Sequence, residues 1–197
     1  MNLRHTNEDG SRMLQDRTKW NERYQKEKYP QGPSAIVKKY AYLAHGKKAL
    51  DIAAGNGRNS IFLAKRGFGV DAIDISDTGL SLFAKKHPNI HAICADFDHY
   101  DIDADHYDLI VNIKFLNRRL FPYIKAGLKP GGILIFQTFL DLSDAAQNSP
   151  DHTDYYLREN ELLHAFLSLK ILLYSETEDK KNGETNWLAS LVAVKIR

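Results

Sequence analysis

The sequence has little of what marks secreted, membrane-spanning or nucleic-acid-binding proteins. A single cysteine, Cys94, excludes an internal disulfide, and its place in the apolar run of residues 91–95 predicts a buried strand residue. No apolar run approaches the length of a membrane span, and residues 1–10 lack the apolar segment of a secretory signal. The net charge of +2 is too small and too scattered to favour nucleic acid. We therefore expect a cytoplasmic protein that binds neither membranes nor nucleic acid.

The length and composition suit one ordinary globular domain. The chain has 197 residues, of which 43% are hydrophobic and 26% are charged, and these fractions are typical of globular proteins with a substantial core. Residues 1–12 are polar and without pattern, which predicts a mobile arm. We expect residues 13–197 to form a single domain whose first helices, within residues 13–45, act as a lid.

Apolar runs and helical patterns alternate through most of the chain. The expected strands lie at 48–53, 69–75, 91–95, 107–113 and 132–139, and the expected helices at 57–66, 77–86 and 117–127. Such alternation indicates a parallel sheet that is covered on both faces. After a helix at 158–167, two β-rich runs at 169–177 and 187–196 flank Asn182-Gly183, a dipeptide that favours a hairpin turn. The fold class is thus a doubly wound, mostly parallel, seven-stranded α/β sheet that ends in an antiparallel hairpin.

The most informative segment is the glycine-containing loop between the first strand and the next helix. Gly55 and Gly57 would present bare backbone to a ligand, and Asp74 ends the following strand, nineteen residues after Gly55. A carboxylate at that place can bind two adjacent ribose hydroxyls. The pattern predicts a ligand that contains a nucleoside.

The details of the loop favour a zwitterionic ligand over a dinucleotide. A dinucleotide fingerprint has a third Gly or Ala where this chain has Ser60. Asp51 also places negative charge near the position that a pyrophosphate would occupy, and Coulomb repulsion disfavours that arrangement. A nicotinamide-dependent oxidoreductase and a non-catalytic cofactor-binding protein stay open as alternatives.

The pattern Asp51-x-Ala53-x-Gly55-x-Gly57 resembles motif I of class I S-adenosylmethionine-dependent methyltransferases, with alanine at 53 where glycine is usual. The similarity extends through Asp74, residues 95–97 and residues 127–136, and covers about residue 18 to the C-terminus. The segments Trp20-Asn-Glu-Arg23-Tyr24 and Tyr155-Tyr-Leu-x-x-x-Glu-Leu162 resemble the small tellurite-resistance and thiopurine-type methyltransferases. The resemblance implies a Rossmann-like methyltransferase fold, S-adenosylmethionine as cofactor and a small-molecule methyl acceptor.

The resemblance and the strand-end positions together imply a set of cofactor-binding residues. These are Asp51, Ala53, Gly55, Gly57, Arg58, Asp74, Ile75, Asp96, Phe97 and Asn112. Gly55 and Gly57 would hold the methionine end, and Asp74 the ribose. Arg58, in the first turn of a helix, either pairs with the cofactor carboxylate or points to solvent. We expect Asp74→Ala to weaken cofactor binding with little loss of fold.

The next two strand ends would complete the cofactor site. Asp96 would accept a hydrogen bond from the adenine amino group, and the ring of Phe97 could pack on the adenine. Because Asp96 opens an acidic stretch, the alternative is a solvated connection. Asn112 would lie near the sulfonium.

A helix near the start of the sequence is the candidate lid. Trp20, Arg23 and Tyr24 share one helical face at i, i+3 and i+4. The face either packs on the domain or closes over the cofactor with an aromatic ring near the sulfonium, since a ring face attracts a cation.

The long polar stretch of residues 141–157 is the candidate substrate loop, with Asp141, His152 and Tyr155 as its candidate contacts. No catalytic residue is assigned, because orientation suffices for an anionic or soft acceptor such as a thiolate or tellurite. A hydroxyl acceptor would need a base, for which His152 and Asp141 are the candidates. Pro88 breaks the helix that would align His87 with His91, so no metal is expected. The chain should be a monomer or a weak homodimer.

Overall fold

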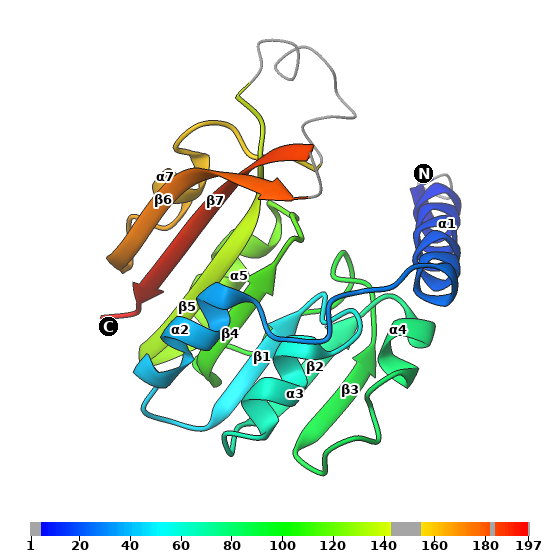
Figure 1. Cartoon of the computed structure of the whole chain (residues 1–197), viewed down its shortest axis with the longest axis horizontal. Coiled ribbons are helices and arrows are strands. Elements are labelled where there is room, and N and C mark those ends of the chain that lie inside the picture. The colour runs from blue at the N-terminus through cyan, green and yellow to red at the C-terminus, as the bar shows by residue number, and fades with distance from the viewer. Residues whose placement is uncertain (1–4, 143–154, 182–183, 197) are drawn as a thin grey trace.

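A seven-stranded sheet with the order β3-β2-β1-β4-β5-β7-β6 forms the centre of the molecule (Figure 1). The computed structural model describes residues 5–142, 155–181 and 184–196. The strands are β1 Lys48–Ile52, β2 Gly69–Asp74, β3 Ile90–Cys94, β4 Tyr107–Ile113, β5 Leu128–Leu140, β6 Lys170–Lys181 and β7 Glu184–Val194. Strands β1 to β5 pair in parallel, whereas β7 pairs antiparallel with both β5 and β6. This topology confirms the predicted fold class.

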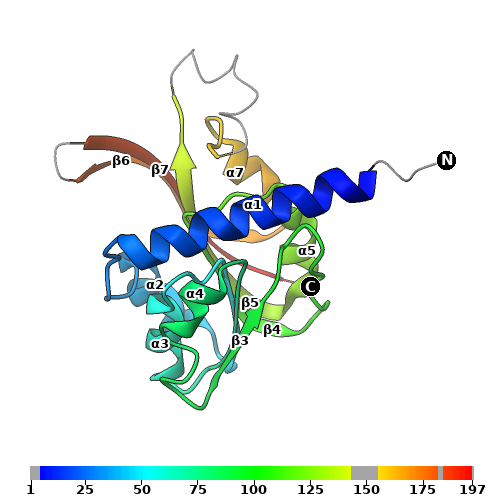
Figure 2. The same cartoon turned by 90° about the vertical axis from the view of Figure 1, so that its right-hand side faces the viewer.

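Helices cover both faces of the sheet. They are α1 His5–Lys26, α2 Ala35–Tyr40, the 3-10 turn η1 Ala41–Leu43, α3 Arg58–Ala64, α4 Asp77–Ser81, α5 Leu120–Gly127 and α7 Glu161–Ala165. Helices α2, α3 and α4 lie on one face of the sheet, and α5 and α7 lie on the other (Figures 1 and 2). The two-sided cover explains why the central strands are almost continuously apolar.

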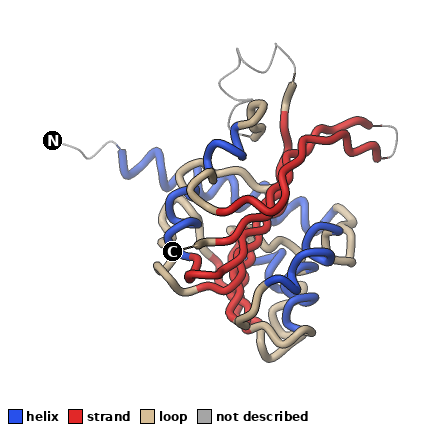
Figure 3. Tube along the Cα trace, turned by 90° about the vertical axis from the view of Figure 1, so that its left-hand side faces the viewer, coloured by secondary structure: helices blue, strands red, loops and turns tan. Residues whose placement is uncertain are grey.

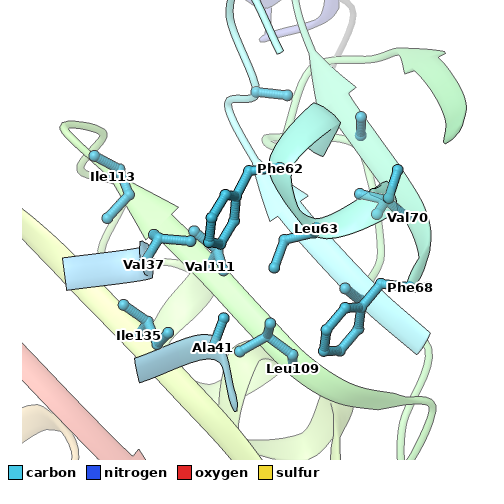
Figure 4. Close-up of a cluster of buried hydrophobic side chains, with 14 of the residues drawn as sticks. Val37, Ala41, Phe62, Leu63, Phe68, Val70, Leu109, Val111, Ile113 and Ile135 are labelled. Atoms are coloured by element: carbon cyan, nitrogen blue, oxygen red, sulfur yellow. The ribbon is translucent and has the colours of Figure 1, made fainter. Parts of the chain in front are cut away.

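The core on the α2–α3 face is formed by branched and aromatic side chains. Val37 of α2 and Leu63 of α3 are fully buried, and they pack with Val111 of β4 and Ile135 of β5 (Figure 4). On the opposite face, the rings of Phe121, Phe136 and Phe166 lie 5.3–5.9 Å apart, at distances typical of tilted and edge-to-face aromatic pairs. These two clusters hold the strand ends that carry the site in fixed positions.

Helix α1 lies outside this two-layer core. It runs across the end of the sheet and contacts α4 (Figure 2). The helix begins at His5, so residues 5–12, for which we expected an arm, belong to it. No helix in the described part of the chain has the length and apolar character needed to cross a membrane.

Cys94 is exposed, so the prediction of a buried strand residue was wrong. It ends β3, which is an edge strand. The adjacent helix α4 ends at Ser81 and not near residue 86 as expected. An edge strand with little helical cover leaves alternate side chains in solvent.

The other edge of the sheet is a long hairpin. Strands β6 and β7 extend beyond the strands they adjoin and form a protruding ribbon (Figure 3). The ribbon extends past the carboxyl end of β5, because Leu140, the last residue of β5, pairs with Trp187 of β7 and β7 continues back to Glu184.

Candidate functional site

The loop after β1 contains three residues in the left-handed conformation. Ala53, Gly55 and Gly57 have φ values of +51°, +59° and +72°. The amide of Gly57 donates to the carbonyl of Ala54 at 2.9 Å, and the chain enters α3 at Arg58. A residue with a side chain pays roughly 1–2 kcal/mol for this conformation, so glycine is favoured at such positions and Ala53 is strained. The loop therefore turns sharply at the strand end.

The open sides of the two glycines face different neighbours. A Cβ atom on Gly55 would lie 2.5 Å from the hydroxyl oxygen of Tyr24 in α1. A Cβ atom on Gly57 would overlap the ring of Phe83, which is fully buried. Glycine at 57 thus makes room for the ring of Phe83 in the core. From the sequence we had expected glycine there in order to present backbone to a ligand. Gly55 faces the helix that we expected to act as a lid.

Asp74 is tied directly to this loop. Because β1 and β2 are neighbours, the end of β2 brings the Asp74 carboxylate beside Gly55, whose amide donates to Oδ2 at 2.8 Å. The amide of Ser76 donates to Oδ1, also at 2.8 Å. Asp74 is 6% exposed, and burial raises its pKa against the opposing effect of these backbone bonds. The acid and the glycine loop form one rigid unit.

Asp51 points inward beneath the loop. Its carboxylate is 1% exposed and accepts a 2.6 Å hydrogen bond from the hydroxyl of Ser60. Burial raises the pKa of Asp51 to about 7, although Ser60 and the charge of Arg58 act in the opposite direction. A carboxyl group that is partly protonated near neutral pH repels phosphate weakly. The argument that Asp51 excludes a pyrophosphate therefore loses force.

Arg58 is half-buried in the first turn of α3. Burial lowers its pKa, while the proximity of Asp51 and Tyr24 raises it. Within the described residues, its guanidinium forms no hydrogen bond or ion pair. A partly desolvated guanidinium whose N–H groups have no hydrogen-bond acceptor is an available binding group for a carboxylate.

Helix α1 presents the ring of Tyr24 to the glycine loop, and the ring of Trp20 lies beside Tyr24. The rings of Trp20 and Tyr24 lie 6.2 Å apart, and burial together with the charge of Asp74 raises the pKa of the Tyr24 hydroxyl. Tyr24 therefore stays protonated at physiological pH. Arg23 instead pairs with Glu27 at 3.0 Å and is exposed, with its guanidinium over the ring of Trp20. Of the three expected lid residues, Tyr24 alone contacts the loop.

Asp96 and Phe97 follow the end of β3. The carboxylate of Asp96 accepts a 2.9 Å bond from the amide of Asp98, which closes a local turn. Phe97 is 4% exposed, and its ring lies 5.8 Å from the rings of Tyr100 and Phe115. Phe97 thus packs in the core, and little of its ring is open to an adenine.

Asn112 and Ile75 lie at the carboxyl ends of their strands, as expected. Asn112 is 1% exposed, and its amide nitrogen donates to the carbonyl of Phe115 at 2.7 Å. Ile75 directly follows β2 and is half-buried. Both residues border the same edge of the sheet as Gly55 and Asp74.

Of the candidate substrate loop, residues 141–157, the structure describes the two ends, residues 141–142 and 155–157. The amide of Asp141 donates to the carbonyl of Leu157 at 3.0 Å, so Asp141 stays close to the end of β5. Tyr155 is 56% exposed, and the ammonium of Lys19 in α1 lies 5.5 Å from its ring centre. His152 lies outside the described residues. Helix α1 thus reaches from the glycine loop to the segment after β5.

Several residues of this region were not identified from the sequence. Asn21 and Arg17 of α1 contact Ser76 and Asp77 at the start of α4. Ser76 had a recognisable signal, because a serine before a helix is a common N-cap and its hydroxyl accepts from Gly79. Asn21 had none. Among the residues that the structure describes, no group of three or more metal-ligating side chains is found.

The chain is similar in sequence to known proteins over the region that contains the glycine loop. Residues 49–132, which contain the glycine loop and Asp74, match the family model described as "Methyltransferase domain". This region of the chain is similar to class I S-adenosylmethionine-dependent methyltransferases. It is 34% identical over 103 residues to the ubiquinone biosynthesis O-methyltransferase of Coxiella burnetii, covering 47% of this chain and 44% of that protein. It is 29% identical over 142 residues to the probable S-adenosyl-L-methionine-dependent methyltransferase TehB of Haemophilus influenzae, covering 66% and 48%.

The fold agrees as well. The crystal structure of TehB from Haemophilus influenzae superposes with a TM-score of 0.71 at 24% identity, covering 83% of this chain and 62% of that one. This chain spans about half the length of the curated relatives that it matches.

The residues present fit S-adenosylmethionine, the cofactor of this class. Each carboxylate oxygen of Asp74 accepts one backbone bond and has a second lone pair available for a ribose hydroxyl. Arg58 offers a positive charge at the start of α3 for the carboxylate of the methionine part. Both groups flank Gly55, where a side chain would collide with Tyr24.

Proposed function

We propose that this chain transfers a methyl group from S-adenosylmethionine to a small-molecule acceptor. The observation that carries the proposal is the 2.8 Å bond from the Gly55 amide to Asp74. That bond fixes a ribose-binding acid against the backbone that would receive the methionine part. A dinucleotide-dependent oxidoreductase would use the same acid, but the incomplete glycine fingerprint and the antiparallel β7 are less typical of it.

The proposed roles follow the strand ends. Gly55 and Arg58 hold the methionine part, and Asp74 holds the ribose. Ile75 and Asp96 border the adenine, and Asn112 lies near the sulfonium. Ala53 and Gly57 shape the loop. Asp51 is too buried to contact the cofactor, and it supports the loop by accepting a hydrogen bond from Ser60 at the start of α3.

The proposed reaction is an in-line displacement. The bound cofactor supplies the methyl group and a sulfur leaving group. The acceptor forms a bond to the methyl carbon as the carbon–sulfur bond breaks and its electron pair goes to sulfur. The contribution of the chain is to orient the partners and exclude water, and the rings of Trp20 and Tyr24 attract the positive charge.

We infer a soft, anionic acceptor such as a thiolate or an oxyanion of tellurium. The reason is the character of the acidic groups around the loop. Tyr24 stays protonated because burial raises its pKa, and Asp51 lies beneath the loop. Neither is suited to remove a proton from a hydroxyl. Asp141 is the remaining described candidate for a base, so a hydroxyl acceptor is the second possibility, favoured by the likeness to an O-methyltransferase.

Isothermal titration calorimetry with S-adenosylhomocysteine and with NAD tests the cofactor. We expect micromolar binding of the first and none of the second. Binding of NAD alone would replace the proposal with an oxidoreductase. Binding of S-adenosylhomocysteine without turnover of any acceptor would indicate a non-catalytic protein.

A panel of acceptors then tests the chemistry. Thiols, tellurite and catechol-type hydroxyl compounds are incubated with methyl-labelled cofactor, and the products are identified by mass spectrometry. We expect transfer to thiol or tellurite, and an Asp141→Asn variant that keeps this activity. Transfer to the hydroxyl compounds alone, with loss of activity in Asp141→Asn, would contradict the soft acceptor.

We further propose that the protein acts in the cytoplasm as a monomer or a weak homodimer, without nucleic acid. Light scattering coupled to size exclusion measures the mass, and a stable higher oligomer would contradict the proposal.

A further inference from the structure

Asn21 carries most of the hydrogen bonds described between α1 and the start of α4. Its amide nitrogen donates to Oδ1 of Asp77 at 2.8 Å. Its amide oxygen accepts from the hydroxyl of Ser76 at 2.6 Å and from the amide of Thr78 at 3.3 Å. Arg17, one turn earlier, pairs with the other oxygen of Asp77 at 2.5 Å. One side chain of α1 thus contacts three consecutive residues at the start of α4.

Ser76 belongs to both this attachment and the cofactor site. Its amide donates to Asp74, and its hydroxyl accepts from the amide of Gly79 while donating to Asn21. Asp74 in turn accepts from Gly55. A continuous series of hydrogen bonds therefore runs from the glycine loop through Asp74 and Ser76 to α1.

The same attachment determines where Tyr24 lies. Tyr24 follows Asn21 by three residues, so the two side chains project from the same side of the helix. A Cβ atom on Gly79 would lie 3.0 Å from the ring of Tyr24 and 3.0 Å from the carbonyl oxygen of Gly55. Glycine at 79 thus lets the ring approach the loop. If α1 moved away from α4, the ring of Tyr24 would leave the loop, and Trp20, whose ring lies 6.2 Å from that of Tyr24, would move with it.

We propose that Asn21 is a positioning residue that fastens α1 onto residues 76–78 and couples closure of α1 to cofactor binding at Asp74. This inference rests on the proposed function. The cofactor enters when α1 is detached, and re-attachment through Asn21 returns Tyr24 and Trp20 to the loop. A ribose held by Asp74 stabilises the Asp74–Ser76 turn, and that turn presents the Ser76 hydroxyl to Asn21.

The strength of the attachment suits a helix that must open. Asn21 forms three hydrogen bonds, and each contributes only modestly to stability because water offers equivalent bonds when the helix is detached. The Arg17–Asp77 pair adds little, because its side chains are 38% and 51% exposed and solvent screens exposed charges. Detachment is therefore accessible without unfolding of the sheet.

Three variants separate positioning from packing. Asn21→Ala removes the attachment. Asn21→Asp keeps an acceptor for Ser76 and Thr78 but places a second carboxylate beside that of Asp77, and the two repel each other. In the double variant Asn21→Asp/Asp77→Asn, the amide at 77 can donate to the carboxylate at 21, and the attachment should recover. Glu22→Ala is the matched control, because Glu22 is exposed and pairs only with Lys26 on the outer side of α1.

Trp20 reports the position of α1 without cofactor. The sequence has two tryptophans, so a Trp187→Phe background leaves Trp20 as the single tryptophan, which is excited selectively at wavelengths that tyrosine does not absorb. We expect Asn21→Ala and Asn21→Asp to increase acrylamide quenching of Trp20, with a melting temperature close to that of the background. Their dissociation constants for S-adenosylhomocysteine should rise about tenfold, the effect of losing roughly one well-formed hydrogen bond. The double variant should reverse both changes, and Glu22→Ala should show neither.

The outcomes are separable from those of the proposed function. Unchanged quenching in Asn21→Ala overturns the attachment. Increased quenching with an unchanged dissociation constant overturns the coupling. If the parent protein binds no S-adenosylhomocysteine, the proposed function and the coupling fail together, and the quenching data still decide the attachment.

Discussion

The backbone amide of Gly55 donates a 2.8 Å hydrogen bond to Oδ2 of Asp74. An acid that would bind the ribose is thereby also a structural element of the loop that would bind the methionine part. The sequence alone predicted that Asp74→Ala leaves the fold nearly intact. Since Gly55 and Ser76 both donate to this carboxylate, we now expect the variant to lose about 1–3 kcal/mol of stability as well.

Asp74→Asn separates these two roles. The amide side chain retains one acceptor, so the domain should fold with a moderate loss of stability. Affinity for S-adenosylhomocysteine should fall tenfold or more, an energy of about 1.4 kcal/mol, because the charged acceptor of the ribose hydroxyls is lost. Asp71→Asn is the control: Asp71 is buried on the same strand and pairs with Lys48 and Tyr107. It should reduce stability and leave affinity unchanged in calorimetry. An equal loss of affinity in both variants would remove Asp74 from the site.

Arg58 should recognise the carboxylate of the methionine part. Arg58→Ala is expected to weaken binding of S-adenosylhomocysteine about tenfold to a hundredfold, since a hydrogen bond to a charged group contributes about 1.5–3 kcal/mol. Binding of 5′-methylthioadenosine, which lacks the amino-acid end, should stay the same. Titration of both ligands measures the difference. Equal losses for both ligands would show that Arg58 acts only by supporting the loop.

Ala53 should be a strained position. Its φ of +51° costs a side-chain-bearing residue roughly 1–2 kcal/mol, whereas the greater conformational entropy that glycine loses on folding costs about 0.5–1 kcal/mol relative to alanine. Ala53→Gly is therefore expected to stabilise the protein by about 0.5–1 kcal/mol on balance. Ala54→Gly, at a buried neighbouring position without positive φ, should destabilise it. Urea unfolding of the two variants measures both changes, and stabilisation by neither glycine would argue against strain at Ala53.

Asp51 should make stability depend on pH. Its pKa is about 7 in the folded chain and about 3.9 in an unfolded one. The folded state therefore keeps a proton that the unfolded state releases, and stability falls as the pH rises from about 4 to about 7. Asp51→Asn lacks this loss, so its stability relative to the parent should increase by about 2 kcal/mol between pH 5.5 and pH 8. Urea unfolding at several pH values measures the difference. A difference between Asp51→Asn and the parent that stays constant over this pH range would contradict the raised pKa of Asp51.

The strands could be predicted from the sequence more accurately than the helices. Strand β4 has the predicted bounds, Tyr107–Ile113, because a strand buried on both faces is a continuous apolar run. Helix α4 ends at Ser81, although the apolar pattern extended to residue 86. Phe83 lies beyond the end of α4, but it is buried against Gly57. An apolar residue buried there has the spacing expected of a longer helix, so the sequence pattern did not show where α4 ends. The polar residues 5–12 carry no apolar pattern, so the start of α1 could not be recognised.

The same contrast holds for the site. The proximity of Gly55 and Asp74 was predictable, because neighbouring parallel strands bring their carboxyl ends together. The contact between Asn21 and Ser76 was not, since it joins residues 55 positions apart through the docking of a helix onto the domain. The burial of Phe97 could not be predicted either, because the rings of Tyr100 and Phe115 contact it only in the folded chain.

The place of β7 between β5 and β6 determines the order in which the sheet can be completed. The strand that leaves the ribosome last of the seven is an interior one. Until residues 184–194 have been synthesised, β5 presents an unpaired edge and β6 has no partner in the sheet. Open edges of this kind pair readily with other chains. A nascent chain arrested before residue 184 is thus the form most prone to aggregate and the one with most need of a chaperone.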